Sequence, residues 1–221
     1  MSGRRLKIST MAVWQVTSAP SVEPLTRSEM KNYLKVPSAT TADDDLIDDL
    51  IVSARQFVER YTSRALIVQT ITEYFDAFPV GDRLAKSLDP RVLQLHIAPV
   101  VSISAATGLA YIPEDGTPDS YTAWDNTANA KYFLDIISGS NGIGPARICK
   151  RDGIDWPTIE PYANAVKVTY VAGYGAAGSN VPAMIKTAMR RIIGTWYFHR
   201  KTAQNEWQDV FDLLAPFKVH K

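Results

Sequence analysis

The chain has little of the side-chain chemistry that metal sites and disulfides require. It contains one cysteine, Cys149, and three histidines among 221 residues. A single cysteine excludes an intrachain disulfide and indicates synthesis in a reducing compartment. A zinc site built from cysteine and histidine is nearly excluded as well. We therefore expect no bound metal and no cofactor.

Long apolar runs and an excess of one charge are also missing. No stretch approaches the roughly 20 apolar residues that span a bilayer, so we expect no membrane partner. The 24 basic and 23 acidic residues leave a net charge of +1, which gives no general attraction to nucleic acid. An apolar fraction of 46% and a charged fraction of 21% are ordinary for a globular protein.

The sequence contains no recognisable catalytic motif. G-x-S-x-G, H-E-x-x-H, C-x-x-C and the P-loop pattern do not occur. His96 lies in a strand pattern and is expected to be half-buried in a sheet, whereas His199 falls at the end of a predicted helix. Cys149 stands between Ile148 and Lys150, which favours a small buried side chain over an activated thiol. We expect no catalytic residue and no enzyme activity.

One glycine pattern resembles a nucleotide-binding fingerprint. Gly173, Gly175 and Gly178 spell G-x-G-x-x-G between a predicted strand and a predicted helix. The helix does not open at the third glycine, and no second strand follows about 20 residues later. We interpret the pattern as a strand-to-helix corner. The alternative is a small ligand- or nucleotide-binding domain that uses these glycines.

The segments on either side of this corner have clear periodicity. Val166, Val168, Tyr170 and Ala172 alternate with more polar residues, which predicts a strand with one buried face. Pro182 suits the first turn of a long helix that follows. The apolar stripe of that helix consists of Ile185, Ala188, Met189, Ile192, Ile193 and Trp196.

Two helices are predicted nearer the N-terminus. Thr26 and Glu29 form a capping box that begins a helix over 26–35. Continuous 3-4 spacing of apolar residues predicts a second helix over 43–63, with arginines near its end that match the helix dipole. The acidic residues at its start are Asp43, Asp44, Asp45, Asp48 and Asp49. They also permit a calcium site, although the EF-hand spacing and glycine are missing, or an acidic patch that faces a basic partner.

Between these helices and the long C-terminal helix the periodicity changes to two. Gly, Pro, Asn and Asp are frequent in 107–131 and 138–145, which predicts loops there. A last amphipathic helix is expected near 210–217. Strands are predicted at 65–75, 92–97, 100–105, 121–124, 132–136 and 147–150.

The order of these elements predicts an α+β fold, in which a small helical bundle carries an antiparallel β insertion. Both Met1 and Met11 remain possible starts of the chain. The predicted parts are an extended N-terminal arm (1–24), a helical bundle (25–64 and 180–217), a β-rich insertion (65–179) and a basic C-terminal tail (218–221).

Six segments appear in an order that resembles a known family. They are LTRSEMKNYLKV, DDDLIDDLIVSARQFVERYTSRALIVQT, WP, AVKVTYVAGYG, VP-x-x-I-K-x-A with WYFHR, and LLAPFK. In this order they resemble the head–tail connector, or adaptor, proteins of long-tailed bacteriophages and related gene-transfer particles. The resemblance covers residues 25–218, but 76–156 match no pattern of the family.

The resemblance implies a structural role in the neck of a virion. Connectors of this family form a ring, expected here to be twelvefold, under the portal protein. The ring extends the DNA channel without sequence-specific binding and meets a downstream neck or tail-terminator protein. Such a subunit is made in the host cytoplasm and ends in the assembled particle.

The resemblance also implies two sets of site residues. The C-terminal segment of such proteins commonly docks on the portal, so a portal-binding tail that is disordered until it binds is expected at Pro216, Phe217, Lys218, Val219, His220 and Lys221. A ring needs two different patches that meet between neighbours. Candidates for this subunit interface are Asp44, Asp45 and Asp48 on one side and Lys186, Arg190 and Arg191 on the other.

Overall fold

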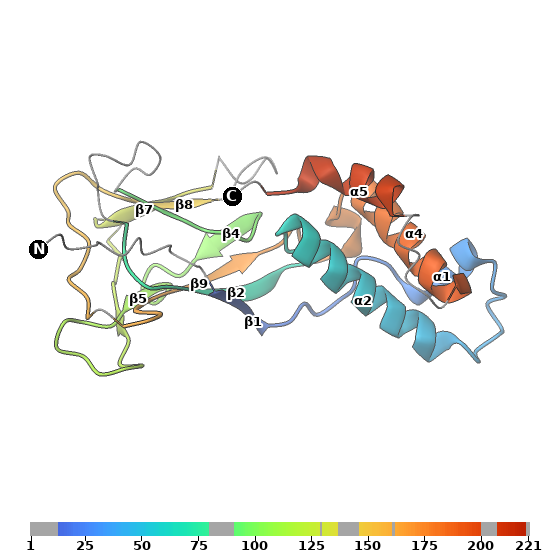
Figure 1. The fold of residues 1–221 in the computed structure, drawn as a ribbon, viewed down its shortest axis with the longest axis horizontal. Helices are drawn as coiled ribbons and strands as arrows, with labels where there is room; N and C mark the ends of the chain where they lie inside the picture. Colours follow the sequence, from blue (N-terminus) through green and yellow to red (C-terminus); the bar gives the residue numbers. More distant parts are fainter. Residues whose placement is uncertain are drawn as a thin grey trace, which may run out of the picture.

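The computed structural model describes residues 13–79, 91–128, 130–136, 146–160, 162–199 and 207–219. The molecule is elongated, with its helices gathered at one end and its sheets at the other (Figure 1). The predicted α+β class with antiparallel sheets is confirmed. The predicted loop over 138–145 and the two possible starts, Met1 and Met11, lie outside the described residues.

The larger sheet is built around two seven-residue strands, β2 and β9, which pair along their whole length. Alternate residues of β9 are buried, as its sequence predicted. All pairings are antiparallel, in the order β1-β2-β9-β5-β6, and β4 also pairs with β9. The strands are β1 (Val13–Ser18), β2 (Gln69–Phe75), β4 (Val100–Ile103), β5 (Leu109–Tyr111), β6 (Thr122–Ala123) and β9 (Val166–Ala172).

A second, three-stranded sheet has the order β3-β8-β7, from β3 (Val92–Gln94), β7 (Tyr132–Asp135) and β8 (Arg147–Lys150). Buried apolar side chains from both sheets form one continuous core. Aromatic rings contribute much of it, and Phe78 stacks on Trp156 with ring centroids 4.8 Å apart. Burial of each large apolar side chain contributes roughly 1.5–3 kcal/mol, so packing between the sheets dominates this end.

The helical end contains α1 (Arg27–Leu34), α2 (Asp44–Thr62), α4 (Ala183–His199) and α5 (Gln208–Leu214), with short 3-10 turns at Gly178–Asn180 and Ala215–Phe217. The predicted capping box of α1 is confirmed, because the backbone N–H of Thr26 donates to Glu29 at 2.8 Å and that of Glu29 donates to Thr26 Oγ1 at 3.2 Å. No helix in these described ranges is long and apolar enough to cross a membrane.

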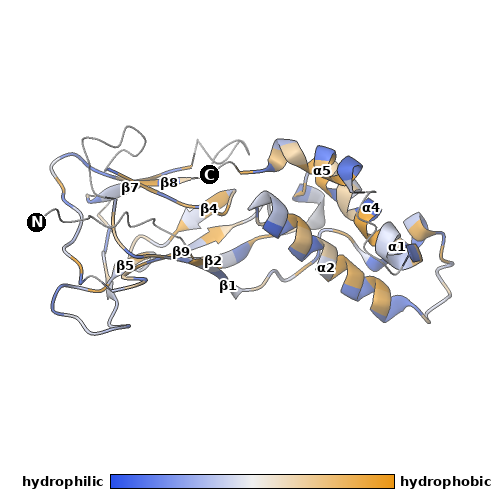
Figure 2. Cartoon of the chain, viewed as in Figure 1, coloured by the Kyte–Doolittle hydropathy of each residue, from blue (hydrophilic) through white to orange (hydrophobic). Residues whose placement is uncertain are grey.

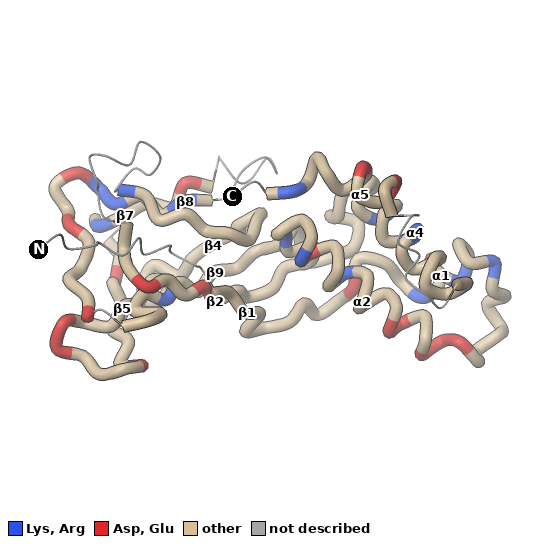
Figure 3. Tube along the Cα trace, in the orientation of Figure 1, with Lys and Arg blue, Asp and Glu red and all other residues tan. Residues whose placement is uncertain are grey.

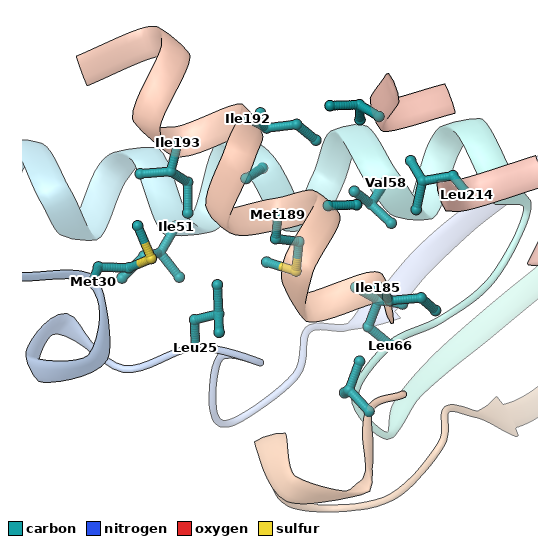
Figure 4. Packing of buried hydrophobic residues seen from close by; sticks show 14 of the residues in the cluster. Leu25, Met30, Ile51, Val58, Leu66, Ile185, Met189, Ile192, Ile193 and Leu214 are labelled. Carbon is teal, nitrogen blue, oxygen red and sulfur yellow. The ribbon is translucent and has the colours of Figure 1, made fainter. Parts of the chain in front are cut away.

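The apolar stripes of the helices face one another in a second core. Figure 2 shows apolar stripes along α2, α4 and α5. In Figure 4, Ile185 and Met189 of α4 lie among Ile51 and Val58 of α2 and Leu214 of α5. The residues of this core flank those of the sheet core on both sides in sequence, and the two sets meet at Ala65 and Leu66, between α2 and β2.

Several strand predictions were wrong in detail. β5 lies within the predicted loop 107–131, and the lead-in predicted as merely extended contains β1. The strands predicted at 92–97 and 100–105 end at Gln94 and Ile103. After β3, Leu95 N still donates to Ala146 O at 2.9 Å, but the next two backbone N–H groups, those of His96 and Ile97, donate to the carboxylate of Glu73 instead of to a strand.

Candidate assembly surface

A buried carboxylate joins the helical end to the larger sheet. Glu59, near the end of α2, accepts hydrogen bonds from Leu66 N at 2.8 Å, Gln69 Nε2 at 2.9 Å and Arg55 Nη1 at 2.8 Å. Burial raises the pKa of Glu59 above its ordinary value, and these donors oppose that rise. Arg55 also donates to Glu23, at 2.8 Å. The network fixes the angle at which α2 meets β2.

A second buried carboxylate lies between the two sheets. Glu73 is fully buried and accepts from His96 N at 2.9 Å, from Ile97 N at 3.2 Å and from the Tyr170 hydroxyl. His96 Nδ1 lies 3.1 Å from the same carboxylate. Burial raises the pKa of Tyr170 well above its ordinary value. All these partners belong to the chain itself, so we assign the cluster a structural role at the crossing of the sheets.

The structure tests the predictions made for His96, Cys149 and His199. His96 is half-buried, as predicted, but it lies in a bend after β3 and not in a strand. Cys149 is buried in β8, as predicted. In the described ranges, no three His, Cys, Asp or Glu side chains come together as a metal site would require. His199 ends α4, as its sequence position indicated.

The acidic start of α2 is clamped by α1. Arg27 Nη1 lies 3.1 Å from Asp44 Oδ2, and Arg27 Nε donates to Asp48 Oδ1 at 2.9 Å. The same guanidinium holds the pKa of Asp48 below its ordinary value. Lys31 Nζ lies 2.5 Å from Asp44 Oδ1 and donates to two backbone carbonyls of the following loop. Asp45 is exposed, which leaves it available to a partner.

An open groove of about 930 Å³ lies between α1, the following loop and the start of α2, lined in part by Arg27, Lys31, Lys35, Asp44 and Asp48. The groove is therefore lined by both basic and acidic side chains, and the ion pairs of Arg27 and Lys31 with Asp44 and Asp48 occupy part of it. Sequence reasoning missed the clamp, although basic residues four apart in α1 were a usable signal for one charged helix face.

Two of the three basic candidates on α4, Arg190 and Arg191, also have ion-pair partners within the chain. Arg190 Nη2 lies 3.5 Å from Glu29, and Arg191 Nη1 lies 3.6 Å from Asp209 of α5. The pKa of Glu29 is lowered chiefly by the backbone N–H of Thr26, with a smaller contribution from Arg190. α1 thus contacts α2 through Arg27 and Lys31 and contacts α4 through Glu29, so the acidic and basic candidates of one chain are not brought together.

The glycine corner is filled by the chain's own backbone. Gly173 N donates to Pro99 O at 2.9 Å, and Gly175 O accepts from Val68 N at 3.0 Å. A Cβ at Gly173, whose φ is 145°, would lie 2.5 Å from Val68 N. One at Gly178 would lie 2.6 Å from Pro24 O, and α4 begins five residues later at Ala183. These contacts account for the glycines as points of close backbone approach.

The C-terminal segment folds back on the end of α2. Val219 N donates to Thr62 O at 2.9 Å, and Arg64 Nε donates to Phe217 O. Lys218 Nζ lies 4.9 Å from the ring centroid of Tyr61. The expected disorder of this tail is therefore wrong for its first four residues, because buried partners hold them. His220 and Lys221 lie outside the described residues.

Arg64 is the most unusual partner in this contact. Its side chain is almost fully buried, and burial lowers the pKa of its guanidinium. The Tyr174 hydroxyl is near enough to oppose that shift, yet in the described part of the chain no carboxylate pairs with Arg64. The backbone carbonyl of Phe217 therefore replaces part of the hydration that the guanidinium of Arg64 loses when it is buried.

No protein-family model matches this chain, and no curated protein matches it in sequence. Solved structures do share its fold. A chain in the neck of an empty gene transfer agent particle, computed with C6 symmetry, matches with a TM-score of 0.70 and 21% identity, covering 95% of this chain and 96% of that one. Chains in the native gene transfer agent virion and in its neck computed with C12 symmetry match with TM-scores of 0.68 and 0.64 at the same identity and coverage. The likeness shows that this chain has the fold of those chains over nearly its whole length.

Proposed function

We propose that this chain is a structural subunit of the neck of a tailed virus or gene-transfer particle, located in the virion. The observation that carries the proposal is the fold likeness to neck chains, which covers 95% of this chain and 96% of the similar chain. A likeness of that extent includes both the helical end and the sheets. The order of sequence segments that resembles connector proteins supports the same role.

In the finer form of the proposal, the chain forms a head–tail connector ring under the portal. The ring would extend the DNA channel and present a surface to the next neck or tail-terminator protein. Symmetry of six or twelve is stated for the necks that contain similar chains, and a twelvefold ring would repeat one heterologous contact around its circumference. No bond is made or broken in this role, so it needs no cofactor.

Charge complementarity supports one part of that contact. The start of α2 is acidic, and its exposed Asp45 would meet Lys186, Arg190 or Arg191 on the α4 of a neighbour. Asp44 and Asp48 already pair with Arg27, so they would share their charge between a partner within the chain and one outside it. Complementary charges of this kind mainly set orientation and association rate.

Portal attachment is proposed for the C-terminal tail, from Pro216 to Lys221. Its first part does not need to fold on binding, because Phe217 and Val219 are already packed on the helical end. Pro216 and Lys218 are exposed and would present a fixed surface to the portal. A pre-formed surface avoids the entropy that a disordered tail would lose on binding.

The experiment that tests the role is reconstitution with portal rings. Purified chain is mixed with portal rings of the same particle, and complexes are separated by sedimentation and imaged by electron cryomicroscopy. We expect a ring of this chain on the tail-facing end of the portal. If no complex forms, and if the chain is also missing from the neck of purified particles, the proposed function is wrong.

The alternative is a ligand- or nucleotide-binding domain that uses Gly173, Gly175 and Gly178. The contacts of these glycines with Pro99, Val68 and Pro24 count against it. A thermal-shift screen with nucleotides separates the two functions, because a ligand at 100 times its Kd adds about 2.7 kcal/mol to stability. We expect no shift.

A further inference from the structure

The outer edge of β1 carries no charge and no proline, and β1 keeps a regular register with β2 over Val13–Val16, with a shift between Val16 and Ser18. Its six residues, VWQVTS, include no charge and no proline, and each of them is exposed. Within the described ranges, β2 is the only strand that pairs with β1. The unpaired backbone groups along this regular, uncharged part are a template for another strand, which natural proteins often block with lysine or proline.

The side chains of β1 continue a buried face of the larger sheet past the point where the second sheet covers it. Trp14 and Val16 lie opposite Glu73 and Ile71 of β2, which are buried in the space between the sheets. Trp14 is nevertheless 37% exposed and Val16 is 43% exposed. The apolar face therefore continues one strand further than the second sheet covers it. Tryptophan exposed beside an open edge is typical of an interface.

The same sheet has a second open edge on its other side. β4 pairs with β9, and among the described residues no strand covers the opposite edge of β4. Val101, which lies at a register shift of β4 against β9, is 49% exposed, and Ser102 beside it is exposed as well. Figure 1 shows β1 at the lower margin of the sheet and β4 at its upper margin.

We propose that β1 of one subunit pairs with β4 of a second copy of this chain, so that the larger sheets join into a continuous β belt. The proposal rests on the connector ring proposed above. Two different edges on opposite sides of one subunit form a heterologous contact, which repeats until the ring closes. Backbone hydrogen bonds would supply the pairing, and Trp14 and Val16 would be covered by the neighbour.

The charged surfaces favour a second copy over a strand from another protein. In Figure 3, α2 with its acidic start lies in the lower part of the view, as β1 does. α4 with its basic residues lies above α2 in the same view. A neighbour that brings its β4 to β1 therefore also brings its α4 toward α2. The same rotation between neighbouring subunits therefore pairs β1 with β4 and places the acidic start of α2 beside the basic residues of α4.

Cysteine cross-linking on portal rings tests the pairing. In a Cys149→Ala background, the double variant Gln15→Cys, Ser102→Cys is assembled on portal rings and oxidised. We expect a ladder of covalent oligomers on a denaturing gel, whereas neither single variant cross-links. Dimers from Gln15→Cys alone would show β1 paired with β1 and would overturn the proposal. Assembled rings without a ladder would overturn it too, while leaving the connector role intact.

A charge on the edge gives an independent measurement. Val16→Lys places a protective lysine on β1, and Val22→Lys places one on an equally exposed valine outside any strand. Both variants should keep the thermal midpoint of the parent, because both side chains are exposed. Val16→Lys should reduce incorporation into rings by at least about tenfold, and Val22→Lys should leave it unchanged. Equal incorporation of the two variants would refute the β1 contact. Failure of the parent chain to form rings would overturn the connector role, and with it this inference.

Discussion

The C-terminal segment offers a prediction whose size can be worked out from its contacts. Removal of residues 219–221 deletes Val219, whose side chain is only 4% exposed and whose backbone N–H donates to Thr62 O at 2.9 Å. Loss of a fully buried valine corresponds to about 1.5–3 kcal/mol. Loss of the hydrogen bond adds about 0.5–1.5 kcal/mol. We therefore expect the deletion to lower the free energy of unfolding by about 2–4.5 kcal/mol.

Urea denaturation followed by tryptophan fluorescence measures this loss. Trp207 and Trp196 lie in the helical core, on which Phe217 of the C-terminal segment also packs, and they report on unfolding of that end. The matched control deletes only residues 220–221, which keeps Val219 and should change stability by less than about 0.5 kcal/mol. A third variant, Val219→Ala, should lose about 1.5 kcal/mol, because it removes two carbons and retains the hydrogen bond. The slope of unfolding free energy against urea should stay constant across the series.

Equal stability of the two deletions would refute the reasoning, since it would show that Val219 contributes nothing in solution. The outcome also decides how portal attachment should be tested. If removal of Val219 destabilises the helical end, loss of portal binding in that variant does not identify a contact. Lys218→Ala then becomes the informative variant, because its ammonium group is exposed and its partner ring, Tyr61, remains packed on the core.

Four further results are expected. Gly173→Ala should destabilise the chain by several kcal/mol in urea denaturation, whereas Gly153→Ala, with nothing within 4 Å of its added Cβ, should lose only about 1–2 kcal/mol; similar losses would contradict the close approach of Val68. Thr26→Ala should cost about 1 kcal/mol through the lost cap of α1, and no change in the urea midpoint would refute the cap. Asp45→Lys should weaken ring assembly without changing the thermal midpoint, whereas Asp44→Lys should lower that midpoint because the new lysine repels the buried Lys31. The reverse pattern would exclude the placement of Asp45 at the subunit interface and of Asp44 in the clamp with α1. Because burial raises the pKa of Glu59 in the folded state, the free energy of unfolding should fall as pH rises from about 4.5 toward that raised value, and Glu59→Gln should remove this component of the pH dependence.

The long elements were predictable because their signals are local. α2 repeats its apolar spacing over 19 residues, and Thr26 with Glu29 marks the start of α1 three residues apart. β9 alternates over seven residues, which is enough to distinguish a strand from a helix. In each case packing of one regular face decides the structure, and the sequence displays that face directly.

The short strands and the polar networks were not predictable, because their partners are distant in sequence. β5 has three residues, too few for a period, and it exists because Leu109–Tyr111 pair with β9. Glu73 accepts from the backbone N–H groups of His96 and Ile97, 23 and 24 positions away, which sequence alone does not connect. The clamp between Arg27 and Asp48 spans 21 positions, and none of the sequence interpretations of the acidic cluster, as a solvated helix start, a calcium site or a patch for a partner, included a pairing with α1.

The buried charges at the junction of helices and sheets have a consequence for assembly. An ion pair such as Arg55 with Glu59 is often no more stable than well-packed apolar residues of the same volume, yet removal of one member is strongly destabilising. Its geometry allows few arrangements, because Leu66 N, Gln69 and Arg55 must all reach one carboxylate. The network therefore fixes the orientation of the helical end relative to β1 and β4.

This fixed orientation matters if one contact in the ring uses strand edges and the other uses α2 and α4. Both contacts must then form at the same rotation between neighbouring subunits, and a hinge between the helices and the sheets would prevent this. Glu59→Ala should accordingly impair ring assembly more than an equally destabilising apolar substitution such as Ile47→Ala, and equal impairment at equal stability would show that the junction serves folding alone.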